Sequence, residues 1–137
     1  MLRRESRIRA RALQLLYAWE TQNRPAFAEV ADGVLQVYGK RGREWDGAAR
    51  LAQRVANAAD RLDAQIADVA QAWRLERLGV IERNILRLGL QELEAGETPP
   101  AVVIDEALRL AHWFAGAKAP AFVNGVLDTL ARRVGRL

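Results

Sequence analysis

The sequence lacks cysteine and has one serine, Ser6, and one histidine, His112. Disulfides and thiolate metal sites are therefore excluded. An HExxH zinc site needs two histidines and is excluded as well, while a Ser-His-Asp hydrolase would have to use the single serine and the single histidine and is disfavoured. We expect no catalytic residue, no metal and no cofactor.

Long apolar runs and phosphate-binding glycine patterns are also absent. No stretch approaches the ~18–20 apolar residues that cross a bilayer, and no apolar h-region follows the basic N-terminus. Gly39, Gly42 and Gly47 are scattered and match neither GxxxxGK[ST] nor GxGxxG. The sequence therefore predicts a cytoplasmic protein with no membrane partner.

The positive charge is concentrated at one end of the chain. Lysine and arginine number 21 against 17 acids, for a net charge of +4 and a pI near 10.3. The first 24 residues hold six arginines and two acids, whereas the other 113 residues hold 15 basic and 15 acidic side chains. A polyanion partner is therefore expected at the N-terminal segment rather than over the whole surface.

Composition and apolar spacing predict an all-α protein. Alanine occurs 25 times, leucine 18 times and threonine three times, and apolar residues recur at intervals of three and four. We expect a single domain over residues 1–137, with about seven helices in two sub-bundles that meet on a buried central helix at 80–95. The other expected helices cover 8–19, about 26–38, 46–73 with a bend near Asp60–Asp63, 101–115 with Phe114 in its apolar stripe, and the segment from Pro120 onward.

Arginines gather on one side of the first helix. At ~100° per residue, an arc beside the apolar stripe holds Arg3, Arg4, Arg7 and Arg11, and Arg9 falls near the opposite edge of the stripe. Guanidinium groups bind phosphate oxygens through two parallel N–H donors, so this face suits a nucleic acid. The alternative is a solvated, salt-bridged face, but only Glu5 and Glu20 are available locally to neutralise it.

Other candidates admit structural interpretations. Phe122 lies at the edge of the last helix's stripe, where it could be the periphery of the core or a platform on which an unpaired base stacks. His112 fits a surface position favoured by the helix dipole. The acid pairs Asp60/Asp63 and Asp105/Glu106 fit solvated or salt-bridged carboxylates better than an acid–base pair, which needs a cleft and unequal environments.

Four sequence blocks, in order, resemble the NusB family of bacterial antitermination factors. The first runs from Arg7-x-Arg9 through Ala12-Leu13-Gln14-Leu15-Leu16-Tyr17-Ala18-Trp19-Glu20, and the second is VIERNILRLGLQEL at 80–93. The third is PAVVIDEALRLA at 100–111, and the most specific is FVNGVLD at 122–128. Residues 24–48 match poorly.

The resemblance implies a fold of two three-helix sub-bundles without catalytic activity. It further implies binding of the single-stranded boxA element of leader transcripts, especially those of ribosomal RNA. The implied protein partner is the ribosomal protein NusE, as a heterodimer that helps RNA polymerase resist termination.

Site residues follow from the same resemblance. The family's arginine-rich RNA-binding segment corresponds here to Arg3, Arg4, Arg7 and Arg9, and Phe122 corresponds to its aromatic on the RNA side. Tyr17 and Glu82 match NusE-facing positions. Asn124 and Asp128 match the closing motif in structural or site-shaping positions.

The chain departs from the family pattern just before Phe122. The lysine expected ahead of the phenylalanine is Ala121, while Lys118 stands where an acid is common. We therefore expect Lys118 to supply a compensating phosphate contact. Two alternatives stay open: a domain of the kind fused to RNA cytosine methyltransferases, disfavoured because the chain stops at Leu137 without a cofactor motif, and a protein-binding adaptor that hides its arginine face in a homodimer.

Overall fold

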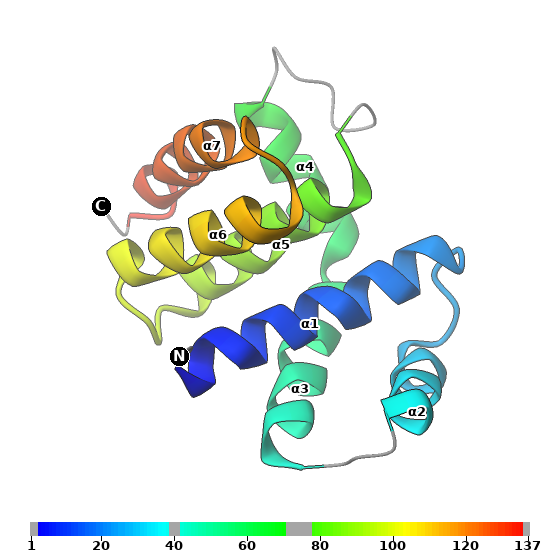
Figure 1. The fold of residues 1–137 in the computed structure, drawn as a ribbon. Coiled ribbons are helices and arrows are strands. Elements are labelled where there is room, and N and C mark those ends of the chain that lie inside the picture. Colours follow the sequence, from blue (N-terminus) through cyan, green and yellow to red (C-terminus); the bar gives the residue numbers. More distant parts are fainter. Residues whose placement is uncertain (1–2, 39–41, 71–77, 136–137) are drawn as a thin grey trace. The chain divides into compact units, whose positions relative to one another are not determined.

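The computed structural model describes residues 3–38, 42–70 and 78–135. These residues contain seven helices and no strand, which confirms the predicted all-α fold (Figure 1). The helices are α1 (Arg4–Thr21), α2 (Phe27–Tyr38), α3 (Arg43–Asn57), α4 (Ala59–Val69), α5 (Val80–Ala95), α6 (Pro100–Phe114) and α7 (Ala119–Arg133). None of the helices in the described residues combines the length and apolar character needed to cross a membrane.

The chain forms two compact units, Met1–Asn57 with helices α1–α3 and Ala58–Leu137 with helices α4–α7. The second unit therefore holds four described helices rather than the three expected. The predicted division of residues 46–73 into two helices is confirmed, with the break at Ala58, two residues before Asp60.

The apolar pattern runs through this break without changing phase. Intervals of three and four residues separate the buried side chains of α3 and α4, which are Trp45, Ala48, Ala52, Val55, Ala59, Leu62 and Ile66. Because neither glycine nor proline interrupts residues 48–70, periodicity alone could show that two helices share one register but could not place the boundary.

In the first unit, α1 lies against both α2 and α3 (Figure 1). Its buried side chains follow the predicted stripe and include Ala12, Leu15, Leu16 and Trp19. The indole N–H of Trp19 donates to the Pro25 carbonyl oxygen at 3.0 Å, which fixes the turn into α2. The predicted break at Arg24-Pro25 is confirmed, since α1 ends at Thr21 and the backbone turns through positive φ at Asn23 and Arg24.

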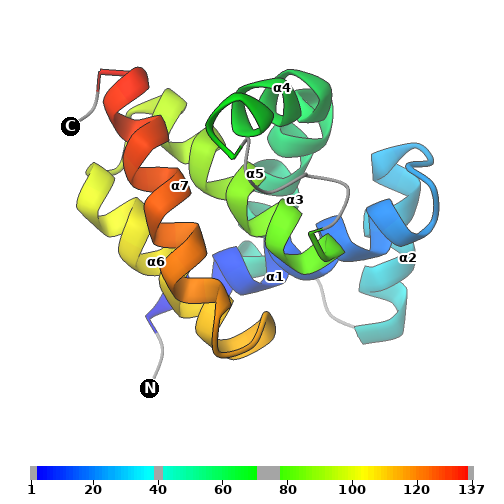
Figure 2. The ribbon, with the colours of Figure 1, turned by 90° about the horizontal axis from the view of Figure 1, so that it is seen from above.

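In the second unit, α5 is the central helix. It packs on α4, α6 and α7 (Figure 2). Ile85, Leu86, Leu90 and Leu93 have no exposed surface, which confirms the buried helix predicted at 80–95. Gly89 permits the close approach of α7, because a Cβ at this position would lie 2.9 Å from both methyl carbons of Leu127.

A buried arginine joins α5 to α4. Arg87 is 1% exposed. Its Nε and Nη2 donate to the two carboxylate oxygens of Asp63 at 2.6 and 2.8 Å, and its Nη1 donates to Asn84 Oδ1 at 2.9 Å. Asn84 in turn donates to the Val80 carbonyl oxygen. The interpretation of Asp63 as a salt-bridged acid is confirmed, and the bidentate geometry offsets the cost of burying the guanidinium.

Other sequence expectations meet mixed outcomes in α6. His112 is exposed in the last turn, as predicted for a surface histidine. Asp105 is exposed, whereas its neighbour Glu106 is buried. Phe114 was expected in the buried stripe, and this was wrong: it is 44% exposed, because the helix ends at this residue and the chain turns through positive φ at Gly116.

Replacing Gly89 with alanine should destabilise the second unit. The added Cβ would force the buried Leu127 side chain to move, at a cost of about 1–3 kcal/mol. The matched control is Gly125→Ala on α7, where nothing lies within 4 Å of an added Cβ and alanine favours the helix by about 1 kcal/mol. Chemical denaturation should rank Gly125→Ala above wild type and Gly89→Ala below it, and equal midpoints for the two variants would contradict this packing.

Candidate nucleic-acid interface

The N-terminal half of α1 presents a cluster of guanidinium groups, formed by Arg3, Arg4, Arg7 and Arg11 and named here the arginine face. Arg3 has extended backbone angles at the N-cap, and both Arg3 and Arg4 are exposed. Arg7 and Arg11 are about one third exposed. The buried stripe sets the rotation of α1, so the predicted arc is displayed on the surface of this unit.

Glu44, in the first turn of α3, lies between two arginines of this face. Arg7 donates from Nε to Oε1 at 2.8 Å, and its Nη2 lies 2.6 Å from the same oxygen. Arg11 reaches Oε2 from Nε at 3.3 Å and from Nη2 at 3.2 Å. Glu5 and Glu20 are the only acids local to the arginines, but α3 brings a third carboxylate from 33 residues beyond Arg11, so part of the arginine face is salt-bridged.

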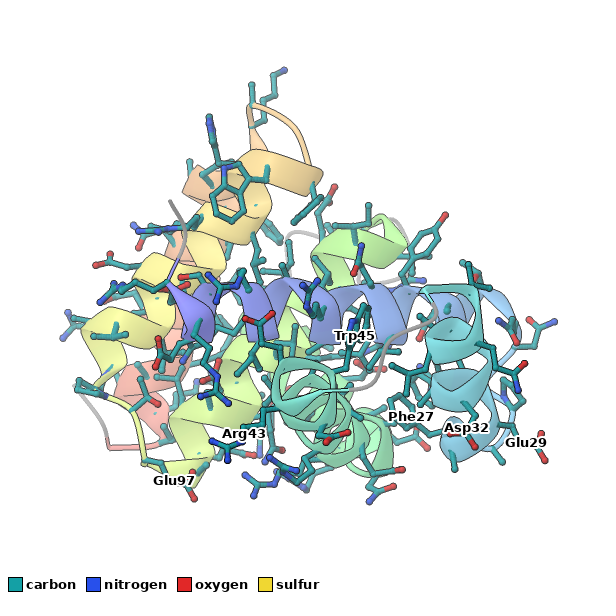
Figure 3. The ribbon with its side chains drawn as sticks, turned by 60° about the horizontal axis from the view of Figure 1, so that its bottom comes forward. Phe27, Glu29, Asp32, Arg43, Trp45 and Glu97 are labelled. Carbon is teal, nitrogen blue, oxygen red and sulfur yellow. The ribbon has the colours of Figure 1, made fainter. Side chains whose placement is uncertain are left out.

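Trp45, next to Glu44, supports the same arrangement. It points from α3 toward α1 (Figure 3), and the guanidinium carbon of Arg11 lies 4.9 Å from the centre of its ring. This cation–π contact and the carboxylate together hold Arg11 in place. Sequence reasoning missed both residues because it began this helix at 46, whereas α3 begins at Arg43; the acids at 44 and 46 were the available signal, since acids favour the first helical turn.

The pairing shifts the ionisation of both partners. The pKa of the Glu44 carboxyl lies below its ordinary value, chiefly because Arg7 donates a hydrogen bond to it and further because of the charges of Arg7 and Arg11; partial burial opposes this shift. The pKa of Arg7 is raised above its ordinary value by the same hydrogen bond. Both groups are therefore charged near neutral pH.

The fifth predicted arginine, Arg9, does not belong to the arginine face. Only 8% of its surface is exposed, and the neighbouring turn of α1 also buries Ser6. Its burial argues against direct contact with a ligand at the surface. Arg24, at the other end of the segment, pairs with Glu20 at 3.5 Å and lies 4.9 Å from the centre of the Trp19 ring.

In the second unit, Phe122 and Lys118 line one groove. The groove has a volume of about 500 Å³ and lies where the end of α4 meets α7; its walls are Val69, Ala70, Lys118, Ala121, Phe122, Gly125, Val126 and Thr129. Lys118 is exposed at the N-cap of α7, and Phe122 is half-buried. Phe122 therefore lies at the periphery of the core, which is one of the two positions considered for it, and it also lines an open groove.

The remaining predicted positions are on helix surfaces. Tyr17 of α1 is 47% exposed, and Glu82 is half-buried in the first turn of α5. Asn124 is exposed, and Asp128 accepts a hydrogen bond from Arg132 at 3.1 Å in an ordinary i,i+4 pair. Among the described residues, no group of three or more carboxylates or histidines could hold a metal ion.

A further groove of about 410 Å³ lies between α2 and α3 in the first unit. Phe27 and Leu35 contribute apolar walls, and Asp32 and Arg50 contribute charges of opposite sign. Phe27 and Asp32 are labelled in Figure 3. No predicted site residue lines it. This groove belongs to the same unit as the arginine face but carries both signs of charge, so it is not expected to attract a polyanion.

Comparison with known proteins gives one consistent result. The NusB family model matches residues 6–132. The transcription antitermination protein NusB of Sorangium cellulosum is 39% identical over 131 residues, covering 94% of this chain and 92% of that protein. The corresponding protein of Solibacter usitatus is 36% identical over 129 residues, covering 93% of this chain and 88% of its own length.

Solved structures show the same relationship. NusB of T. maritima superimposes with a TM-score of 0.83 at 27% identity, covering 96% of this chain and 92% of its own. A crystal structure of antitermination factors NusB and NusE in complex with dsRNA includes a chain with a TM-score of 0.82 at 28% identity, covering 97% of this chain and 99% of its own.

An NMR titration of the Glu44 carboxyl carbon should give a pKa below the ordinary glutamate value of about 4.3. Because the folded-state pKa is lowered, the pairing stabilises the protein above that ordinary value, and the stabilisation is lost as the pH falls through the folded-state pKa. In Arg7→Ala the pKa should rise, and in the control Arg132→Ala it should not change. A Glu44 pKa that is the same in Arg7→Ala as in wild type would contradict the assigned cause.

Proposed function

The chain belongs to the NusB family of transcription antitermination proteins, and on that premise we propose that it binds the single-stranded boxA element of leader transcripts. The transcripts in question are chiefly ribosomal RNA precursors. The protein binds this RNA as a heterodimer with ribosomal protein NusE and helps RNA polymerase resist termination. Residues 1–137 work as a single RNA-binding domain without catalytic activity.

The observation that carries this proposal is the arginine face. Arg4, Arg7 and Arg11 stand in the first half of α1 and Arg3 at its N-cap, and Arg7 and Arg11 share the carboxylate of Glu44. An RNA strand carries one phosphate per nucleotide, so several guanidinium groups can each contact a phosphate. Each arginine–phosphate contact releases a condensed counterion. Affinity gained in this way is independent of base sequence and falls steeply with salt.

Glu44 orders the guanidinium groups before RNA arrives. Arg11 engages Glu44 through Nε and Nη2, two of its five N–H donors, so three donors are outside that pairing. A phosphate oxygen can therefore be bound without displacing the carboxylate. Because the side chain is already held, less conformational entropy is lost on binding.

Base recognition requires a different surface from phosphate recognition. Unpaired bases expose their edges and both ring faces, and they stack on aromatic side chains. The groove lined by Phe122 offers such a ring, and Lys118 at its rim offers a cation for the adjoining phosphate. This supports the expectation that Lys118 compensates for Ala121 at the position where a lysine is common.

The NusE-facing positions are proposed to be Tyr17 in the first unit and Glu82 in the second. Tyr17 is a large, half-exposed aromatic of the kind that is enriched at protein interfaces, and Glu82 adds a carboxylate. The solved complex of NusB and NusE contains dsRNA, so duplex RNA belongs in any test beside the single strand.

Fluorescence anisotropy should show tighter binding of a boxA-like single strand than of a scrambled strand or of the corresponding duplex. For Arg7→Ala, the slope of log affinity against log salt should fall by about 0.7, the value for one phosphate contact on a single strand. Arg61→Ala is the matched control, because Arg61 is also an ion-paired surface arginine but lies on α4. Equal slopes for wild type and Arg7→Ala would remove Arg7 from the contact surface.

NusE should strengthen RNA binding, and RNA should strengthen NusE binding by the same factor. Coupling between two sites is typically ~1–3 kcal/mol, or about fivefold to 150-fold in affinity. Tyr17→Ala should weaken NusE binding while leaving RNA affinity in the absence of NusE unchanged. An RNA affinity that is identical with and without NusE would contradict cooperative assembly. Analytical ultracentrifugation tests the homodimeric adaptor, which would be favoured if this chain formed a stable dimer that binds no RNA.

A further inference from the structure

Two large aromatic side chains are exposed side by side at the C-terminal end of α6. Trp113 is 40% exposed and Phe114 is 44% exposed. Their ring centres lie 6.3 Å apart, with an angle of 81° between the ring planes. Single exposed apolar residues need no explanation, but an adjoining pair of aromatic rings on the surface marks a candidate contact site.

The surroundings of this pair are cationic. The guanidinium carbon of Arg109 lies 5.9 Å from the centre of the Trp113 ring. Lys118 follows Trp113 by five residues and is exposed, so their Cα atoms lie within about 18 Å of each other by chain length alone. Within residues 3–38, 42–70 and 78–135, no carboxylate forms an ion pair with Arg109 or Lys118.

The aromatic pair is also adjacent in sequence to the groove already proposed to bind RNA. Lys118 lines the groove that contains Phe122, and the segment 115–118 joins that groove to Trp113 and Phe114. A strand of a few nucleotides spans such a distance. One base could therefore occupy the Phe122 groove while another meets the exposed pair.

We infer that Trp113 and Phe114 form a stacking platform for an unpaired RNA base, with Arg109 binding the adjoining phosphate. This rests on the proposed RNA-binding function. Aromatic rings stack with every base, so the platform adds affinity with little sequence preference. Arg109 provides both a cation for the phosphate and a contact that orients the Trp113 ring.

Size favours a base over a protein as the occupant. An aromatic side chain can bury about 150–250 Å² in full, so the exposed part of each ring is roughly 100 Å². One base covers an area of this size, whereas a protein partner would bury about 800 Å² and so contact many residues besides these two rings. The two half-exposed rings match the flat, apolar face of one base, and the nearby cations match the charged phosphate of the same nucleotide.

The decisive variant is Trp113→Ala, with binding of a boxA-like single strand measured by anisotropy in the full chain. We expect affinity to fall about fivefold or more, the low end of the stacking contribution per base, with an unchanged salt slope because no charge is removed. Trp113→Phe should retain part of the affinity. Arg109→Ala should instead lower the salt slope by about 0.7.

Val102→Ala is the matched control. Val102 is 38% exposed on the same helix and, at eleven residues from Trp113, lies on the same face by helical geometry. The substitution Val102→Ala removes exposed apolar surface without removing an aromatic ring, so this variant should bind RNA with the same affinity as wild type. Thermal midpoints of all variants should match, since every altered side chain is partly exposed.

Tryptophan fluorescence gives a second readout on the wild-type protein. The chain has four tryptophans, of which Trp19 and Trp45 are 6% and 7% exposed and Trp73 lies outside the described residues. The readout is therefore the difference between wild type and Trp113→Phe: a base that stacks on Trp113 should quench emission in wild type, and Trp113→Phe should abolish that part of the change. If wild type and Trp113→Ala bind RNA with equal affinity, the stacking platform is overturned and the proposed function stands. Wild type that binds no RNA would overturn both, and a loss of NusE binding alone in Trp113→Ala would identify a protein contact instead.

Discussion

The first helix has to serve two surfaces at once, and the organisation of its unit follows from that constraint. One side of α1 buries Leu15, Leu16 and Trp19 against α2 and α3. The adjoining side carries the arginine face. Because the apolar contacts fix the rotation of the helix, they also fix where the guanidinium groups of Arg4, Arg7 and Arg11 point, so the packing of α1 and the proposed binding surface depend on the same helix.

Glu44 connects these two surfaces. It belongs to the helix that packs on α1, yet its carboxylate lies between Arg7 and Arg11. Like-charged guanidinium groups at this spacing repel one another, and a shared carboxylate reduces that repulsion while leaving the face positive. Glu44 thus partly neutralises the positive charge of the first 24 residues, and the rest of that charge is the surface proposed to bind phosphate.

The sequence predicted most of the fold, and its failures have identifiable causes. Gly96 and Pro99-Pro100 mark helix ends, so α5 and α6 agree with prediction to within a residue. The α3–α4 boundary was predicted two residues too late because the apolar phase continues across Ala58. Glu44 was missed because its contact with α1 is made through tertiary packing, which local charge counting cannot detect. Arg9 shows that helical angles predict the side of a helix on which a residue lies but not how deeply its side chain is buried.

Amide chemical-shift mapping by NMR tests the central claim most directly, namely that the arginine face is where RNA binds. A boxA-like single strand should shift the amides of residues 3–11, with a second group at 118–122, and leave those lining the α2–α3 groove unchanged. Shifts confined to that groove, with the start of α1 unaffected at saturating RNA, would contradict the account.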